Sequence, residues 1–517
     1  MTKNYLDILA ETICSNWDQP ALTDFYLTED GTAQDTSRGK HYTYGEMYAE
    51  IVRVANMLTS LGLQKGDHIA ICGANSAHWV IAYLAIAKIQ GVSVTIMHSL
   101  QPDQIAQMVD FSDTKALFVD KELWMELSPF FQEGDRGRLS NVISLEDWDV
   151  LYGEKQIINN KFEIKNDQCQ FVHGSPDELA MICFTSGSTE DAKGVMLSYR
   201  NISNNAKNIT DGYPDDDITH FLSVLPMAHV YGFMTEIIAQ LLKGEHIYIL
   251  ASCLTIDTLY KSIQLNRPYA LRLIPILLSK LIETHRDSIY ILRSTCKQIY
   301  IGGALFDKVL EQTLLASKVP ISVGYGQTET GPLISYTICT EYKAGTCGKI
   351  VEGMNCRVTP NGEILVKGEN VMLGYYKDPE ATAQKIDKDG WLHTGDKGHL
   401  DEDGYLYVEG RLEQDIIVLP NGENIRPDNI EALINALPEV KESIVLARDG
   451  KLVAIVVADK KIINLKSEII NIGELRRNIL RAINPQLPLF SQLYDVEITD
   501  QPLQRTEKQT IKRYLYS

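Results

Sequence analysis

The sequence predicts an α/β fold with a large N-terminal domain and a smaller, mobile α+β domain. Short apolar runs alternate with amphipathic segments up to about residue 330, which is typical of parallel sheets with helices on both faces. After Gly331 short β-like pieces follow one another, and a mixed α+β pattern begins beyond Arg411. We therefore expect two α/β sheet layers plus a small β-subdomain in residues 1–411, and a separate domain in residues 412–517.

The first predicted helix covers residues 43–61. Its apolar residues recur at steps of four and three, Thr43 and Glu46 form a capping box, and Gly62 follows the last turn. Strands and helices then alternate, with strands expected at 68–72, 92–96, 116–119, 221–225, 246–250, 298–301 and 321–323, and helices around 79–89 and after Pro102.

The β-subdomain is predicted from the strand-like run 362–367 and from Asp403-Gly404, a dipeptide that favours a hairpin turn between 398–400 and 405–408. Residues 412–517 contain segments with helical periodicity and short apolar runs, a mixture that predicts a separate α+β domain. Helices are expected there at 427–437 and 473–483, and strands at 443–447, 451–457 and near Val496.

Composition excludes several classes of protein. The 517 residues exceed a single ordinary core, and a net charge of -19 disfavours nucleic acid as the main partner. The nine cysteines show neither zinc-ligand spacing nor a disulfide framework, which suits a reducing cytosol. No apolar stretch reaches the roughly 18 residues of a membrane span. We expect a cytoplasmic protein without a transmembrane segment, and peripheral contact with a membrane stays open.

The segment FTSGSTEDAKGV, residues 184–195, is the strongest local indication of chemistry. An apolar run, residues 179–184, stops in a loop of Gly, Ser and Thr that ends in Lys193-Gly194. Free backbone N–H groups, hydroxyls and one cation suit a polyphosphate. The segment is not a Walker A loop, because Lys193 is followed by Gly194 rather than Ser or Thr. A flexible surface loop is the alternative for this segment alone.

Eight segments, taken together and in order, resemble the adenylate-forming superfamily of acyl-CoA synthetases, peptide-synthetase adenylation domains and luciferases. They are FTSGSTEDAKGV (184–195), FLSVLPMAHVYG (221–232), YIGGAL (300–305), GYGQTETGP (324–332), GEILVKGENVMLGYY (362–376), WLHTGD (391–396), YLYVEGR (405–411) and IVLPNGENIRP (417–427). The chain looks most like a bacterial long-chain fatty acyl-CoA ligase. This resemblance implies two half-reactions: a carboxylate attacks the α-phosphate of ATP, and a thiol then takes the acyl group from the adenylate.

The resemblance also implies how the triphosphate is held. Two anions must approach each other, so the site has to supply positive charge and hydrogen-bond donors. Thr328 would donate to the α-phosphate, and Glu329 would bind Mg²⁺ together with Thr185. For Glu329 the alternative is a solvated surface acid. The residues expected to hold the β- and γ-phosphates are Thr185, Ser186, Gly187, Ser188, Thr189 and Lys193.

The nucleoside is assigned by the same resemblance. Asp396 would accept hydrogen bonds from the two ribose hydroxyls, with Arg411 beside it. An ordinary turn residue is the alternative for Asp396. Glycines allow close approach of the backbone, and a tyrosine ring can stack on the base. The residues expected to surround the adenine are Gly303, Ala304, Tyr325 and Gly326.

His229 resembles the residue that lines the acyl pocket and gates the carboxylate, and a satisfied core histidine is its alternative. Family members rotate their small domain between the half-reactions about a residue two positions after Arg411, which is Glu413 in this chain. The loop around Gly422 would then meet the pantetheine thiol of CoA.

Four departures from the family pattern limit what the resemblance implies. Two of them are Ala192, where proline is usual, and Tyr199, where many acyl-CoA synthetases have histidine. Glu190 adds a negative charge to the phosphate loop, where glycine is usual. Ungapped alignment places Thr510 where the family has its adenylation lysine. We expect Lys508 to take that role, with Lys512 as the second candidate.

The expected function is ATP-dependent formation of an acyl-CoA, with ATP, Mg²⁺ and CoA required. A long-chain fatty acid is the expected substrate, because residues 362–396 and 417–425 look most like long-chain acyl-CoA synthetases. The largely apolar region between His229 and Tyr300 adds little, since any core helix is apolar. One alternative is an enzyme that loads an amino or aryl acid onto a carrier protein, which an Asp or amide in residues 221–232 would favour. The other is a catalytically weak nucleotide-binding member of the family. The sequence leaves the oligomeric state open.

Overall fold

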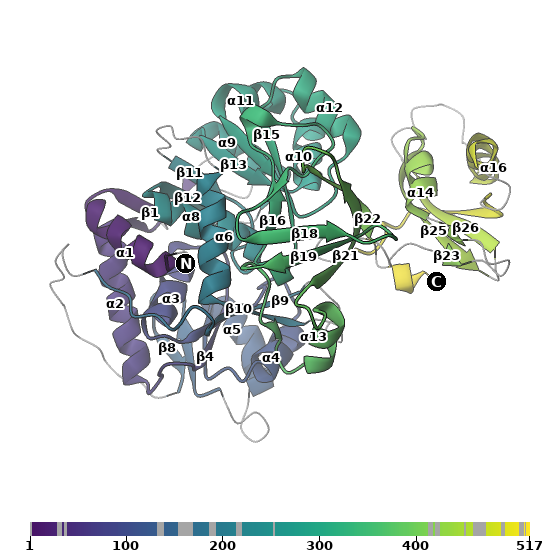
Figure 1. The fold of residues 1–517 in the computed structure, drawn as a ribbon. Coiled ribbons are helices and arrows are strands. Elements are labelled where there is room, and N and C mark those ends of the chain that lie inside the picture. Colours follow the sequence, from purple (N-terminus) through teal and green to yellow (C-terminus); the bar gives the residue numbers. More distant parts are fainter. Residues whose placement is uncertain are drawn as a thin grey trace. The chain divides into compact units, whose positions relative to one another are not determined.

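The computed structural model describes most of the chain. The described residues are 3–27, 34–35, 39–131, 139–153, 169–185, 193–212, 220–251, 254–411, 417–418, 424–425, 427–448, 451–458, 472–487, 492–505, 511 and 513–516. The chain divides into two compact units, a large one that takes in most residues up to Val408 and a smaller one that consists mainly of the residues from Glu409 onward. Sheets and helices alternate in the large unit (Figure 1), so the predicted α/β class is confirmed.

One sheet of the large unit has a parallel centre. Its order is β17 (Lys349–Ile350), β16 (Leu333–Tyr336), β15 (Ile321–Gly326), β14 (Gln298–Ile301), β13 (Ala270–Leu273), β11 (His220–Ser223), β12 (His246–Leu250), β1 (Pro20–Leu27) and β2 (Gln34–Asp35), with β3 (His41–Thr43) also on β1. The strands from β15 to β1 are parallel neighbours. The carboxyl ends of these strands therefore share one edge, where α/β proteins bind their ligands.

The second sheet carries the phosphate-loop strand. Its order is β20 (Gly374–Tyr375), β10 (Gly194–Ser198), β9 (Leu179–Phe184), β5 (Val92–Thr95), β4 (His68–Cys72), β6 (Ala116–Val119), β7 (Asn141–Ser144) and β8 (Val150–Tyr152). The centre is parallel from β9 to β7, while β10 and β20 extend one edge in antiparallel pairing. The predicted parallel strands are thus confirmed, and short antiparallel strands close the edge beside the phosphate loop.

Helices cover both sheets, and the predicted helix at 43–61 is confirmed as α2 with its capping box at Thr43 and Glu46. The helices are α1 (Tyr5–Ser15), α2 (Tyr44–Ser60), α3 (Ala77–Lys88), α4 (Pro102–Phe111), α5 (Lys121–Leu127), α6 (Tyr199–Asp211), α7 (Val230–Gly232), α8 (Ala239–Lys243), α9 (Ile256–Asn266), α10 (Pro275–Thr284), α11 (Ser288–Thr295), α12 (Lys308–Ala316) and α13 (Pro379–Lys385). None of the helices in the described residues is both long and apolar enough to span a membrane.

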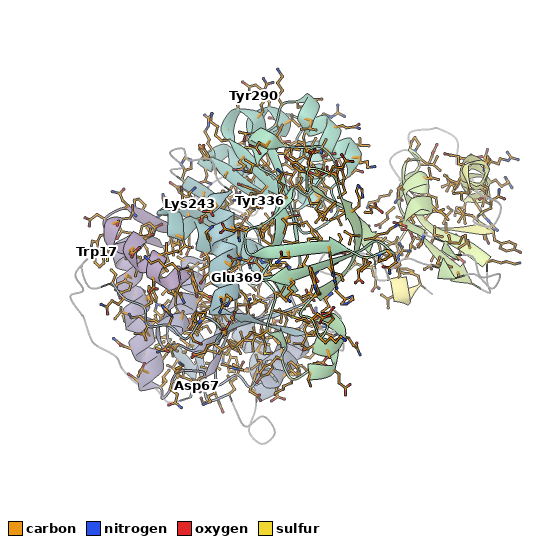
Figure 2. The ribbon with its side chains drawn as sticks, viewed as in Figure 1. Trp17, Asp67, Lys243, Tyr290, Tyr336 and Glu369 are labelled. Atoms are coloured by element: carbon orange, nitrogen blue, oxygen red, sulfur yellow. The ribbon has the colours of Figure 1, made fainter. Side chains whose placement is uncertain are left out.

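Helix α6 runs through the middle of the large unit (Figure 1). Near its first turn Arg200 lies 3.8 Å from Glu369, and at its end a side chain on Gly212 would collide with the Tyr336 ring. Glu369 and Tyr336 accordingly mark the two ends of this helix in Figure 2. Both faces of α6 are buried, so the helix ties segments from distant parts of the chain together.

Within the described residues, a four-stranded sheet forms the predicted β-subdomain. Its strand order is β18 (Met354–Val358), β19 (Glu363–Gly368), β21 (Leu392–Leu400) and β22 (Leu406–Arg411). The hairpin predicted around Asp403-Gly404 joins β21 to β22, with Gly404 at a positive φ of 80°.

In the smaller unit, β25 (Val440–Arg448), β26 (Lys451–Ala458) and β27 (Asp495–Thr499) form one sheet, and β23 (Ile417–Val418) pairs with β24 (Asn424–Ile425). Two helices, α14 (Pro427–Asn435) and α16 (Ile472–Ile483), share a core with these strands.

Candidate active site

The base of the phosphate loop is closed by hydrogen bonds between its two ends. The Thr185 amide donates to the Lys193 carbonyl at 3.0 Å, and the Lys193 amide donates to Thr185 Oγ1 at 3.1 Å. These bonds continue the β9–β10 pairing, which brings the two ends of the loop together. Residues 186–189 and Glu190 lie outside the described residues. Of the predicted phosphate contacts, the structure therefore describes Thr185 and Lys193.

Lys193 and Glu329, far apart in the sequence, both contact Tyr375. The Lys193 ammonium lies 5.0 Å from the centroid of the Tyr375 ring, and the Tyr375 hydroxyl donates to Glu329 Oε1 at 2.7 Å. Tyr375 is fixed by pairing of β20 with β10 and by its amide, which donates to Thr382 Oγ1 at 2.8 Å. The predicted phosphate cation and the predicted metal ligand are thus neighbours of one buried ring.

The turn that carries Thr328 and Glu329 follows β15 as a short 3₁₀ helix, η3 (Thr328–Thr330). Both side chains are buried, with 4% and 8% of their surface exposed, so the alternative of a solvated acid at Glu329 does not hold. The Met372 amide donates to the Glu329 carbonyl at 2.9 Å and fixes the turn. At Gly326 a Cβ would lie 1.8 Å from the Pro332 carbonyl oxygen, so only glycine allows this backbone course.

The residues expected around the adenine lie at the ends of neighbouring strands. Gly302, Gly303 and Ala304 follow β14, and Tyr325 lies on β15 beside it. Gly303 has a φ of 81° and is exposed together with Ala304, while Tyr325 is half-buried. These residues therefore lie at the carboxyl edge of the sheet that contains β14 and β15. Their contact with an adenine base stays a prediction.

His229 caps the short helix α7, where its Nδ1 accepts a hydrogen bond from the Tyr231 amide at 3.1 Å. Its side chain is half-buried. The Tyr231 ring lies against Gly302, because a Cβ there would be 3.2 Å from both Cζ and Oη. Tyr231 therefore lies beside the Gly302-Gly303 turn. The role of His229 near the acid stays a prediction.

Two further predicted residues lie on the β-subdomain strands. Asp396 is in β21 with 7% of its surface exposed, and Arg411 ends β22. The loop around Gly422, the hinge residue Glu413 and both candidate lysines, Lys508 and Lys512, lie outside the described residues. Their roles stay predictions.

The position of Glu329 bears on the predicted magnesium site. The described residues contain no cluster of three or more His, Cys, Asp or Glu side chains suited to a metal. Mg²⁺ is commonly bound through one or two carboxylates together with substrate phosphates. The buried carboxylate of Glu329, which accepts a hydrogen bond from the Tyr375 hydroxyl, fits that mode of binding.

Comparison with known proteins identifies the class. The family described as AMP-binding enzyme matches residues 16–376, and the C-terminal domain of AMP-binding enzymes matches residues 414–516. The chain belongs to the AMP-binding enzyme family, as the resemblance predicted, and the prediction of an AMP-forming acid–thiol ligase is confirmed at that level.

Particular relatives agree with this class. A 2-succinylbenzoate–CoA ligase of Bacillus cereus is 28% identical over 81% of this chain and 82% of its own length. A probable CoA ligase of Humulus lupulus is 27% identical over 81% and 78%. The fold is shared with ATP-bound MatB from Rhodopseudomonas palustris, at a TM-score of 0.80, 23% identity and coverage of 99% and 98% of the two chains.

Proposed function

We propose that this chain activates a carboxylic acid with ATP as an acyl-adenylate and transfers the acyl group to CoA. The observation that carries the proposal is the contact of Lys193 and Glu329 with Tyr375. A cation suited to phosphate oxygens and a carboxylate suited to Mg²⁺ lie on the same aromatic ring. This pairing is what a metal-bound triphosphate requires.

In the first half-reaction a carboxylate oxygen of the acid attacks the α-phosphorus, and the bond to the bridging oxygen of pyrophosphate breaks. Lys193 offsets negative charge on the triphosphate, and Thr328 donates to the α-phosphate. Glu329 and Thr185 would hold Mg²⁺, which when bound neutralises phosphate charge.

In the second half-reaction the CoA thiolate attacks the acyl carbon, a C–S bond forms, and AMP leaves with the oxygen that came from the acid. We assign Lys508 to the first step and the loop around Gly422 to the second, with Glu413 as the hinge between domains 1–411 and 412–517. These assignments rest on the sequence pattern.

The identity of the acid and of the acceptor belongs to the same proposal. The segment FLSVLPMAHVYG, residues 221–232, contains no Asp, Asn or Gln, so it lacks the feature that would favour an amino acid substrate. CoA is favoured over a carrier protein because the curated relatives are CoA ligases. The long-chain fatty acid and the cytoplasmic location stay predictions.

Isotope exchange between pyrophosphate and ATP tests the first half-reaction. We expect exchange without CoA in the presence of a suitable fatty or aryl acid, and release of AMP once CoA is added. ATP binding without exchange for any fatty, aryl or amino acid would contradict catalysis and favour a nucleotide-binding role.

A further inference from the structure

A short, largely buried segment follows the carboxyl end of β11 and ends in His229. We call residues 224–229 the His229 segment. Inside it the His229 amide donates to the Pro226 carbonyl at 3.1 Å, which makes a tight turn. Gly232 packs against this turn, because a Cβ there would lie 2.7 Å from the Pro226 carbonyl oxygen. The groups that bond to this segment therefore set where the His229 ring lies.

Asn75 holds the middle of the His229 segment from the other sheet of the large unit. It follows the carboxyl end of β4. Its Nδ2 donates to the Leu225 carbonyl at 2.8 Å, and its Oδ1 accepts from the Met227 amide at 2.9 Å. One side-chain amide thus bonds to the backbone on both sides of the turn. The loop that carries Asn75 is itself held, since Asp120 Oδ2 accepts from the Ala74 amide at 2.8 Å.

Thr95 holds the end of the same segment. It is the last residue of β5, only 1% of its surface is exposed, and its hydroxyl donates to the Ala228 carbonyl at 3.0 Å. The same hydroxyl lies 3.6 Å from Sγ of Cys183, its register partner on β9. Strand β9 leads directly to Thr185 at the base of the phosphate loop. Ala228, the residue before His229, therefore lies close to the strand that carries the phosphate loop.

The start of the His229 segment is held by Glu236 of the π-helical turn η2 (Phe233–Ile238). Its Oε2 accepts from the amides of Val224 and Leu225 at 3.1 and 3.0 Å. Glu236 belongs to the part of the chain that follows the segment, whereas Asn75 and Thr95 belong to the other sheet. Only these last two side chains connect the segment to the sheet of the phosphate loop through the bonds described above.

The ring at the end of the segment has a defined tautomer. Because His229 Nδ1 accepts from the Tyr231 amide, the ring is the neutral form with its proton on Nε2. An N–H donor of this kind suits a carboxylate oxygen, as expected of the residue that gates the acid.

We propose that Asn75 and Thr95 are positioning residues for the acid. Through the backbone of the His229 segment they fix the separation between the His229 ring and the phosphate loop, so that the carboxylate of the acid meets the α-phosphate. Orientation of two reactants contributes strongly to the rate of a step that joins them. This inference rests on the proposed function and on the role of His229 within it.

The test measures KM for the acid and KM for ATP separately in the pyrophosphate exchange assay with the full-length protein. The acid is the one that exchanges fastest among hexanoate, palmitate and benzoate. Thr95→Val replaces the hydroxyl by a methyl group of similar size and leaves the Ala228 carbonyl without its donor. We expect KM for the acid to rise about tenfold, because a buried carbonyl loses its partner and the segment shifts.

KM for ATP should change little in Thr95→Val, since β9 keeps its backbone pairing with β5 and β10. Thr95→Ser retains a hydroxyl and should restore most of the wild-type KM for the acid. Asn75→Ala removes two bonds and should raise KM for the acid by more than Thr95→Val does.

Thr114→Val is the matched control. Thr114 is equally buried, with 1% of its surface exposed, and its hydroxyl bonds to Ser112 Oγ at 2.8 Å. It precedes β6, at the amino end of the same sheet, so its substitution should leave both KM values unchanged. Thermal unfolding and ATP binding check that each variant is folded.

A merely structural role would lower the amount of folded enzyme, and hence kcat, without changing KM for the acid. That result in Thr95→Val and Asn75→Ala, or an equal rise in both KM values, would overturn the inference while leaving the proposed function intact. Failure of Thr95→Ser to restore KM for the acid would also overturn the role of the hydroxyl. Absence of exchange by the wild-type protein with any fatty, aryl or amino acid would contradict the proposed function and, with it, this inference.

Discussion

At the scale of single residues, Tyr375 is the centre of the candidate triphosphate site. Its hydroxyl orients Glu329, and its ring lies below the Lys193 ammonium. A group that orients a metal ligand commonly changes metal affinity or activity about 10- to 100-fold when it is removed. If Glu329 binds Mg²⁺ as proposed, Tyr375 has a positioning role that the sequence motif alone did not reveal.

Tyr375→Phe should keep the ring below Lys193 and remove only the hydrogen bond to Glu329. We expect pyrophosphate exchange to fall about tenfold, with a larger requirement for Mg²⁺ at half-maximal rate, because the carboxylate is less well oriented. Tyr376→Phe is the matched control, since that hydroxyl donates to Asp113 instead. Equal effects of the two substitutions would show that Tyr375 has no special connection with the metal.

The sequence predicts part of the candidate triphosphate site, and the rest depends on contacts between distant segments. Lys193 ends a Gly/Ser/Thr loop whose composition suits a polyphosphate, whereas the role of Glu329 is predicted only by the family resemblance of its motif. The contact through Tyr375 depends on pairing of β20 with β10, which joins segments far apart in the chain.

At the scale of elements, α6 differs most from what its composition indicates. Four asparagines of α6, residues 201, 204, 205 and 208, are buried even though the helix is polar. Their amides bond to backbone groups of residues 330, 333, 352, 369 and 371. By contrast α2 was predicted within one residue at each end, because its capping box and periodicity are local. The asparagines of α6 bond to distant parts of the chain, and such bonds leave no periodic pattern in the sequence of the helix.

Asn205→Ala should destabilise the large unit. Asn205 donates to the Thr330 carbonyl at 3.0 Å and accepts from the Leu333 amide at 2.8 Å, and both groups would lose their partner in a buried site. We expect a loss of about 2–4 kcal/mol in the free energy of unfolding, measured by urea denaturation. The control Asn266→Ala, whose amide donates to the Ser262 carbonyl one turn earlier in α9, should cost less than about 1 kcal/mol. Similar losses at both positions would contradict the role assigned to α6.

At the scale of the whole molecule, the large unit holds most of the described site residues, and the C-terminal part is expected to supply the adenylation lysine. Lys508→Ala should lower acyl-adenylate formation on the order of 100-fold or more, as expected when charge stabilisation of a transition state is lost. Lys512→Ala should change it little. Single-turnover formation of the adenylate measures this difference directly, and equal effects of the two substitutions would contradict the assignment of Lys508.

In the proposed reaction, an acyl-adenylate links the two half-reactions. An acid labelled with ¹⁸O in both carboxylate oxygens follows that link, because the attacking oxygen stays on AMP when the thiol displaces it. With ATP, CoA and the preferred acid, mass spectrometry should find one ¹⁸O in each AMP and none in pyrophosphate. Unlabelled AMP, or ADP and phosphate as the products, would show that the acid is not activated as an acyl-adenylate.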